Sequence, residues 1–218
     1  MPHFMKQVQL TEDQYEMLQE IVNIAMGQAG HDLAIILKSF VDLSVPEILV
    51  VEAEHVADKI LQESVFSEKE QVNLFRQTFY NTAFIEGEAI VLFDNETRQQ
   101  FYEILGLSDK MDAVEEIDFM LELTNLMVGA CLNNISTQLF NQAMTFSSPE
   151  LLSENSRLGN IAYDIFKRRN LKWDYTLLSK ITFKLKERSF KSDLLIFISQ
   201  EAINAVAQAL DKLLAEYE

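Results

Sequence analysis

The sequence has little of the chemistry on which disulfides, metal centres and nucleotide sites depend. It has one cysteine, Cys131, so an internal disulfide is excluded. Its three histidines, His3, His31 and His55, occur singly and without the spacing of zinc ligands. It also lacks a glycine-rich phosphate loop of the GxxxxGK[ST] type, which argues against an NTPase. We therefore expect no metal site and no cofactor of the protein's own.

Basic residues and long apolar runs are also scarce. There are 18 Lys and Arg against 34 Asp and Glu, and the net charge of −16 argues against nucleic acid and anionic membranes as partners. No apolar run approaches the length of a membrane span, and the start of the chain lacks the apolar core of a signal peptide. We therefore expect a cytoplasmic protein. A hydrophobic content of 48% within 218 residues suffices for the core of one domain or of two intimately fused halves.

One pattern occurs twice along the chain. An acid, a glutamate and an asparagine follow one another at i, i+4 and i+7, which places them in one row on a helix. A proline follows the asparagine after a gap of twenty-two residues in the first copy and twenty-three in the second. The two copies consist of Glu16, Glu20, Asn23 and Pro46, and of Asp118, Glu122, Asn125 and Pro149.

Apolar residues at helical spacing lie opposite each polar row, so the row is expected to face outward. The inward residues are Leu18, Ile21, Val22, Ala25 and Ala29 in the first copy, and Met120, Leu123, Thr124, Met127 and Cys131 in the second. Cys131 is therefore interpreted as a buried structural thiol instead of a nucleophile. An outward polar row is in itself typical of a solvated helix face. Asparagine is a mediocre helix former, however, so its recurrence at identical spacing favours a function.

The periodicity predicts the same order of elements in both halves: helix, strand, short helix, hairpin and helix. Thr11 and Ser199 are predicted to cap the first and last helices. In the first half we expect a helix over 12–39, a strand over 41–51 around Pro46, a helix over 53–63, a hairpin of 72–84 and 88–93 turning at Glu86-Gly87, and a helix from Asp94 or Asn95 to Leu105, stopped by Gly106. In the second half we expect a helix over 114–141, a strand over 143–152 around Pro149, a helix over 155–169, strands over 177–188 and 194–198, and a helix to Glu216. The predicted fold is α/β, a pseudo-two-fold repeat that forms one mainly antiparallel sheet flanked by helices.

The double pattern resembles that of the CheC/CheX/FliY phosphatases of bacterial chemotaxis. Two copies in a chain of this length are most similar to CheC, and the resemblance covers nearly the whole chain. The sequence departs from the family pattern in two places. Glu16 stands where the family has Asp or Ser, and the segment after each asparagine keeps only its second glycine, Gly27 and Gly129. The resemblance implies a single CheC-like domain over 1–218, made of two internal repeats of about 1–110 and 111–218.

The resemblance implies a phosphatase that hydrolyses the aspartyl phosphate of a CheY-like response regulator. Glu and Asn without an activated nucleophile make a poor free-standing hydrolase, so they suit a partner that brings most of the machinery, including its own Mg²⁺ and lysine. In that family's terms the asparagines would enter the regulator's active site and orient a water, and the glutamates would pair with the regulator's lysine. The corresponding residues are Asn23 and Asn125 for the water, Glu20 and Glu122 for the lysine, Glu16 and Asp118 as supporting acids, and Pro46 and Pro149 as structural residues.

Two other functions remain open on the sequence. One is a non-catalytic interaction module like the middle domain of the flagellar switch protein FliM, which looks alike but lacks the Glu and Asn. The other is a regulatory adaptor that binds CheD, because CheC-like proteins are associated with that receptor deamidase. The retained Glu and Asn pairs favour the phosphatase over the FliM-like module.

Overall fold

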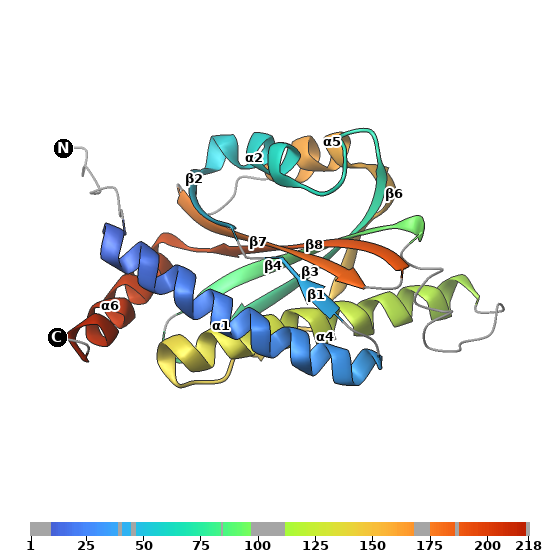
Figure 1. Cartoon of the computed structure of the whole chain (residues 1–218). Coiled ribbons are helices and arrows are strands. Elements are labelled where there is room, and N and C mark those ends of the chain that lie inside the picture. The colour runs from blue at the N-terminus through green and yellow to red at the C-terminus, as the bar shows by residue number, and fades with distance from the viewer. Residues whose placement is uncertain are drawn as a thin grey trace.

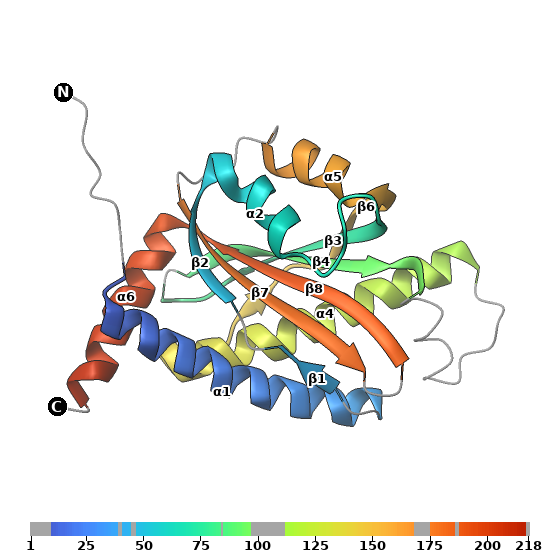
Figure 2. The same ribbon diagram turned by 45° about the horizontal axis from the view of Figure 1, so that its top comes forward.

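The chain forms three layers, with one β-sheet between two layers of helices (Figures 1 and 2). The structure is a computed structural model that describes residues 10–38, 41–44, 47–83, 85–96, 112–167, 175–185 and 188–216. Helices α1 (Glu12–Leu37), α4 (Ala113–Phe140) and α6 (Gln200–Glu216) cover one face of the sheet. The other face carries α2 (Val56–Glu63), preceded by a short 3₁₀ turn (Ala53–His55), and α5 (Leu158–Ile161), continued by a π-helical segment (Ala162–Lys167).

The two motif helices begin where their local sequence predicts. The hydroxyl of Thr11 accepts from the backbone N–H of Gln14, whose side chain accepts from the Thr11 N–H in return. Asp112 and Glu115 form the same reciprocal capping box at the start of α4. Such a box satisfies two of the backbone donors that a helix start leaves without partners. Ser199 likewise caps α6, as predicted, by accepting from the N–H of Ala202.

Across the described ranges the sheet has eight strands, and its observed pairings are antiparallel. The strand order is β1-β7-β8-β4-β3-β5, with β2 paired to β7 and β6 paired to β3. The counterparts in the two halves are β1 and β5, β3 and β7, and β4 and β8. If each strand is exchanged with its counterpart, the same order is read from the opposite edge of the sheet. The predicted class, a symmetric α/β arrangement around one antiparallel sheet, is therefore confirmed. The strands are β1 (Val41–Leu43), β2 (Glu47–Glu52), β3 (Gln71–Tyr80), β4 (Glu86–Asp94), β5 (Thr145–Phe146), β6 (Glu150–Arg157), β7 (Tyr175–Leu185) and β8 (Arg188–Ile198).

The strands before and after the two motif prolines lie at the two edges of the sheet, β1 and β2 at one edge and β5 and β6 at the other. An edge tolerates a residue without an N–H donor. The sequence predicted one strand over 143–152, but the structure divides it into β5 and β6 with Pro149 in the break. The register is the same at both edges, because Phe146 of β5 pairs with Phe79 of β3 while Leu43 of β1 pairs with Phe183 of β7. The strand predicted over 41–51 is similarly divided into β1 and β2, and Pro46 lies outside the described residues.

The predicted hairpin turn at Glu86-Gly87 is wrong. Both residues belong to β4, and the connection to β3 begins at Asn81, whose side chain accepts from the backbone N–H groups of Ala83 and Ile85. Gly87 is needed for a different reason. A Cβ built there would lie 2.1 Å from the carbonyl oxygen of Phe197 and 2.5 Å from the ring of Phe79. Gly87 is therefore needed because its neighbours leave no room for a side chain, and not because it makes a turn.

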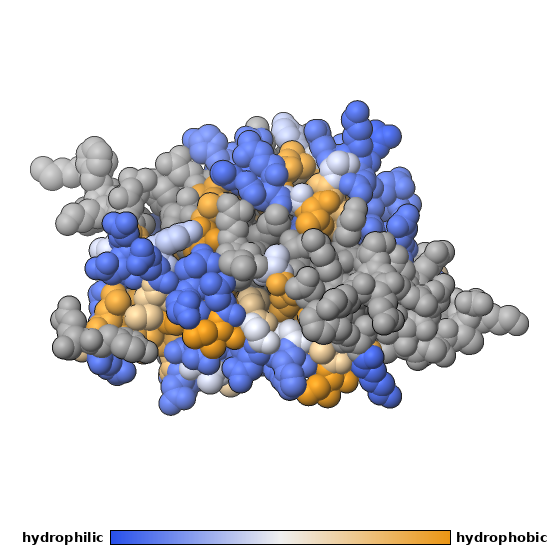
Figure 3. Space-filling model, in the orientation of Figure 1, coloured by the Kyte–Doolittle hydropathy of each residue, from blue (hydrophilic) through white to orange (hydrophobic). Residues whose placement is uncertain are grey.

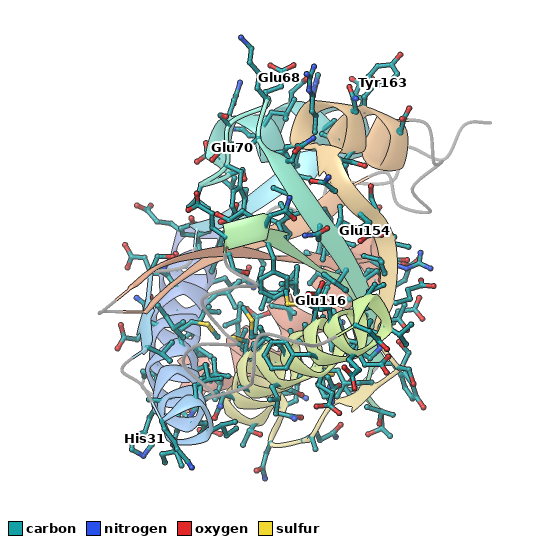
Figure 4. All side chains as sticks on the ribbon, turned by 90° about the vertical axis from the view of Figure 1, so that its right-hand side faces the viewer. His31, Glu68, Glu70, Glu116, Glu154 and Tyr163 are labelled. Atoms are coloured by element: carbon teal, nitrogen blue, oxygen red, sulfur yellow. The ribbon has the colours of Figure 1, made fainter. Side chains whose placement is uncertain are left out.

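Alternating residues of the central strands divide the core between the two faces. In β4, Ala89, Val91 and Phe93 pack on the side of α1, α4 and α6, whereas Ile90 and Leu92 pack on the side of α2 and α5. A view along the sheet shows Glu68, Glu70 and Tyr163 on the α2 and α5 side and His31 on the opposite side (Figure 4). The two motif helices therefore share one face of the sheet, as predicted.

Several predictions differ from the structure or fall outside the part that it describes. The helix predicted over 155–169 begins only at Leu158, because β6 continues to Arg157. The helix predicted to end at Leu105 and the boundary between the halves near residue 110 lie outside the described residues. Among the described helices, none has the length and apolarity to cross a membrane.

Candidate functional site

Both polar rows lie on the outward side of their helices. The inward residues predicted for both copies are all buried, Cys131 among them. In the first row Asn23 is half-buried, whereas the other side chains of the two rows are exposed: Glu16, Glu20, Asp118, Glu122 and Asn125. Within the described part of the chain, the four carboxylates form no ion pair or side-chain hydrogen bond. They are therefore available to a cationic group that comes from outside.

The rows lie on exposed helix surface, outside the two cavities that described residues line. A cavity of about 60 Å³ lies between α1, α4, α6 and the sheet, and its lining is apolar apart from Ser136. A smaller cavity of about 20 Å³ between α4 and the sheet is lined in part by Glu116 and Glu154, which Figure 4 shows on α4 and β6. No motif residue lines either cavity. Neither of these two cavities therefore offers a small-molecule substrate a binding site at the rows.

The two rows lie on α1 and α4, which run antiparallel on the same face of the sheet (Figure 1). Where α1 and α4 meet, the side chain of Asn134 donates to Asp32 at 3.4 Å. These two residues are separated by 102 positions, as are Asn23 and Asn125, and each motif asparagine precedes the contact by nine residues. At a rise of 1.5 Å per residue, eighteen residues separate the asparagines by roughly 27 Å along the helices. Each row is therefore a site of its own.

In the second row Asn125 is held from beneath by a buried glutamine. Gln77 of β3 is 1% exposed, and its Nε2 donates to Oδ1 of Asn125 at 2.6 Å. The same Nε2 donates to the carbonyl oxygen of Ser147 at 2.8 Å. Ser147 lies between β5 and β6, two residues before Pro149, and pairs with Thr78 of β3 through its N–H and its hydroxyl. The proline segment and the asparagine of the motif thus meet through Gln77.

Sequence reasoning missed Gln77. The signal that it carries is a long polar side chain between Phe75 and Phe79, at a strand position whose neighbours two residues away are buried. A polar residue there needs a hydrogen-bonding partner on the same face of the sheet. The sequence does not say which helix supplies that partner.

In the first row the asparagine is held less firmly. Oδ1 of Asn23 accepts from Gln19 of the same helix at 3.5 Å, the outer limit of a hydrogen bond. Helix α1 itself is tied to the sheet nearby, because the hydroxyl of Tyr15 donates to the carbonyl oxygen of Ile48 at 2.9 Å. The proline of this copy, Pro46, lies outside the described residues.

Each row continues into a small, open and apolar stretch of helix. Ile24 is 49% exposed and Leu126 is 36% exposed, and each directly follows its motif asparagine. Gly27 and Gly129 come four residues after the asparagines, and a Cβ built at either would meet no atom within 4 Å. Figure 3 shows hydrophobic surface interrupting the hydrophilic surface along α1. Packing within the chain therefore explains neither glycine.

Neither a thiol nucleophile nor a metal cluster accompanies the rows in the described part of the chain. Cys131 is fully buried, and burial raises the pKa of its thiol, which keeps it protonated. Among the described residues, no three His, Cys, Asp or Glu side chains gather closely enough to hold a metal ion. The predicted absence of a metal site stays a prediction.

Comparisons with known proteins place the fold. No family model and no curated protein matches the sequence. Among solved structures, FliY from Thermotoga maritima is similar with a TM-score of 0.63 and 18% identity, over 94% of this chain and 99% of that chain. The FliM middle domain from H. pylori has a TM-score of 0.54 and 9% identity, over 92% of this chain and 99% of that chain. The chemotaxis protein CheX from Vibrio vulnificus has a TM-score of 0.50 and 11% identity, over 83% of this chain and 97% of that chain. The chain thus has the fold of the CheC/CheX/FliY chemotaxis proteins, and the resemblance that the double motif predicted is confirmed at the level of the fold.

Proposed function

We propose that this protein is a phosphatase for the aspartyl phosphate of a CheY-like response regulator. The observation that carries the proposal is the pair of outward rows, each with a glutamate and an asparagine on open helix surface. Such a row cannot enclose a substrate, but it can enter the active site of another protein. The fold, which FliY and CheX share, supports the same conclusion.

The chemistry asked of the row is small. An aspartyl phosphate is an activated acyl phosphate, and the regulator's own Mg²⁺ and lysine stabilise its charge. Water attacks phosphorus, the bond to the aspartyl oxygen breaks, and the carboxylate leaves as inorganic phosphate is released. The task left to Asn23 or Asn125 is to hold that water in line with the leaving oxygen, as in other phosphoryl transfers.

The rest of each row docks the regulator. Glu20 and Glu122 are two free carboxylates that pair with the regulator's lysine, and Glu16 and Asp118 add negative charge one helical turn earlier. Opposite charges across an interface fix register and speed encounter. Mg²⁺ belongs to the regulator in this proposal, and the phosphatase holds none.

The FliM middle domain is a reason to keep one alternative, because its fold is as similar to this chain as that of CheX. A non-catalytic interaction module would need the helix surface but not the amide of the asparagines. Binding of CheD would likewise leave the asparagines without a chemical role. Removal of the two amides separates these alternatives from catalysis.

The deciding variant is Asn23→Ala with Asn125→Ala. Incubated with a phosphorylated CheY-like receiver and Mg²⁺, the wild-type protein should accelerate phosphate loss, and the double variant should lose nearly all of that acceleration. Loss of one positioned polar group typically lowers a rate by about 10²-fold. The fold should survive. Asn23→Ala should change the free energy of unfolding by only a few tenths of a kcal/mol, whereas Asn125→Ala should lower it by about 1–3 kcal/mol, because one Nε2 hydrogen of the buried Gln77 loses its acceptor. A folded double variant with the wild-type rate would overturn the proposal and favour the interaction module.

A further inference from the structure

Gln77 is a buried amide whose hydrogen bonds run toward one of the two rows. Both bonds come from its Nε2, to the Ser147 carbonyl at 2.8 Å and to Oδ1 of Asn125 at 2.6 Å. Its Oε1 is buried and has no hydrogen-bond partner among the described residues. A buried polar atom without a partner destabilises the folded state, so its retention calls for an explanation.

The Ser147 carbonyl determines the orientation of both amides. A backbone carbonyl only accepts, so the nitrogen end of Gln77 must face it. The second hydrogen of that nitrogen then points at Asn125 and requires an acceptor, which only Oδ1 of the asparagine can be. The amide of Asn125 is thereby fixed with its oxygen toward the sheet. One lone pair of Oδ1 and both Nδ2 hydrogens remain for a group outside the protein.

The first row has no such support in its sequence. Phe79 and Phe183 hold matching positions, because each pairs with the strand that precedes the motif proline. Gln77 precedes Phe79 by two residues, so its counterpart two residues before Phe183 is Ile181. An isoleucine cannot donate a hydrogen bond to Asn23. The hydrogen bond described for Asn23 comes from the side-chain amide of Gln19 on the same helix, and at 3.5 Å it is long.

We propose that Gln77 is a positioning residue that pre-orients Asn125 and makes the second row the faster of the two sites. The role in catalysis rests on the proposed function, but the orientation of Asn125 does not. A side chain already held in one rotamer does not lose that freedom when it engages its target, which lowers the barrier of the step that it serves.

The orientation is tested on the isolated protein by NMR relaxation of the side-chain amide nitrogens, with Asn23→Ala and Asn125→Ala used for assignment. In the wild type, Asn125 Nδ2 should be more ordered on the picosecond-to-nanosecond timescale than Asn23 Nδ2. Gln77→Met, which keeps the length of the side chain but removes both donors, should lower the order of Asn125 to that of Asn23. Unchanged order of Asn125 in Gln77→Met would overturn the proposal, whatever the protein's activity.

The catalytic role is tested with each site in isolation. In the Asn23→Ala background, where only the second site works, Gln77→Met should lower kcat by about 3- to 10-fold and leave KM for the phosphorylated receiver unchanged. In the Asn125→Ala background, where only the first site works, the same substitution should change neither constant. A change in KM alone, or an equal fall in both backgrounds, would show docking or general damage and refute the positioning role.

Folding is the remaining control. Gln77→Met removes the buried oxygen without a partner and leaves the Ser147 carbonyl in an exposed segment where water can reach it. The melting temperature of the variant should therefore equal or exceed that of the wild type. If wild-type protein dephosphorylates no receiver, the proposed function fails, while the relaxation experiment still decides the orientation of Asn125.

Discussion

At the scale of single residues, burial decides which side chains can react. Cys131 is the only thiol of the chain, and it lies at 0% exposure on the inward face of α4. Removal from water disfavours the thiolate, so burial raises the pKa of the thiol in the folded state. The same helix presents Asn125 outward, so a few positions along one helix separate an inert group from an available one.

The first prediction concerns this thiol. Native protein at pH 8 should react with a thiol reagent far more slowly than protein unfolded in urea. Because the pKa of Cys131 is raised by folding, the unfolded state ionises first as the pH rises. The free energy of unfolding should therefore fall above the ordinary thiol pKa, and below it this contribution should be fully present. Urea unfolding from pH 7 to 10, with Cys131→Ala as the control that lacks this pH dependence, measures the difference. Rapid labelling of the folded protein would contradict the burial.

At the scale of elements, each motif helix contains one glycine that a larger residue could replace without a clash inside the chain. A glycine in a helix interior costs about 0.8–1.0 kcal/mol relative to alanine. Gly27 and Gly129 occur at matching places, each four residues after a motif asparagine and with open space around the missing side chain. In the proposed function a docked regulator fills that space. A bare helix surface lets the partner approach closely enough for the asparagine to reach its phosphate.

The second prediction is that stability and activity change in opposite directions at these glycines. Gly27→Ala and Gly129→Ala should each raise the free energy of unfolding by about 0.5–1 kcal/mol. Each should also raise KM at its own site, because the added methyl group obstructs docking. Thermal unfolding measures the effect on stability. Kinetics of Gly27→Ala in the Asn125→Ala background, and of Gly129→Ala in the Asn23→Ala background, measure the effect on KM at each site. A gain in stability with unchanged KM would remove the glycines from the docking surface.

At the scale of the whole molecule, the pseudo-two-fold arrangement gives two sites that have no hydrogen-bonding residue in common. The asparagines are separated by roughly 27 Å along antiparallel helices. Asn23 accepts from Gln19 of its own helix and Asn125 accepts from Gln77 of β3, so they share no hydrogen-bond partner. Sites this distant, with no shared contacts, are expected to act additively.

The third prediction follows from that separation. At a receiver concentration well below KM, the rates of Asn23→Ala and Asn125→Ala should sum to the wild-type rate within experimental error. The variant that keeps Asn125 should contribute the larger share, because Gln77 supports that site alone. A single substitution that abolishes all activity would show that the two sites act as one unit and not in parallel.

The sequence by itself determined what depends on neighbours along the chain. The 3.6-residue period placed the outward rows and the inward faces of α1 and α4 correctly. Thr11 caps α1 and Ser199 caps α6, as predicted. The sequence also predicted a strand around each proline, and the structure has strands before and after both positions, β1 and β2 in the first half and β5 and β6 in the second. The double motif led to the right fold through its resemblance to the CheC/CheX/FliY family.

Only the tertiary structure decided what depends on register between distant strands and helices. Gly87 looks like a turn residue along the chain, yet the backbone of Phe197 and the ring of Phe79 explain it. Gln77 and Asn125 are 48 positions apart, and their contact exists because β3 and α4 pack at one particular offset. A shift of one residue in the strand would turn Gln77 to the other face. The two asparagines hold equivalent motif positions, and they differ as sites because Gln77 packs beneath Asn125 while the matching strand position of the other half is Ile181.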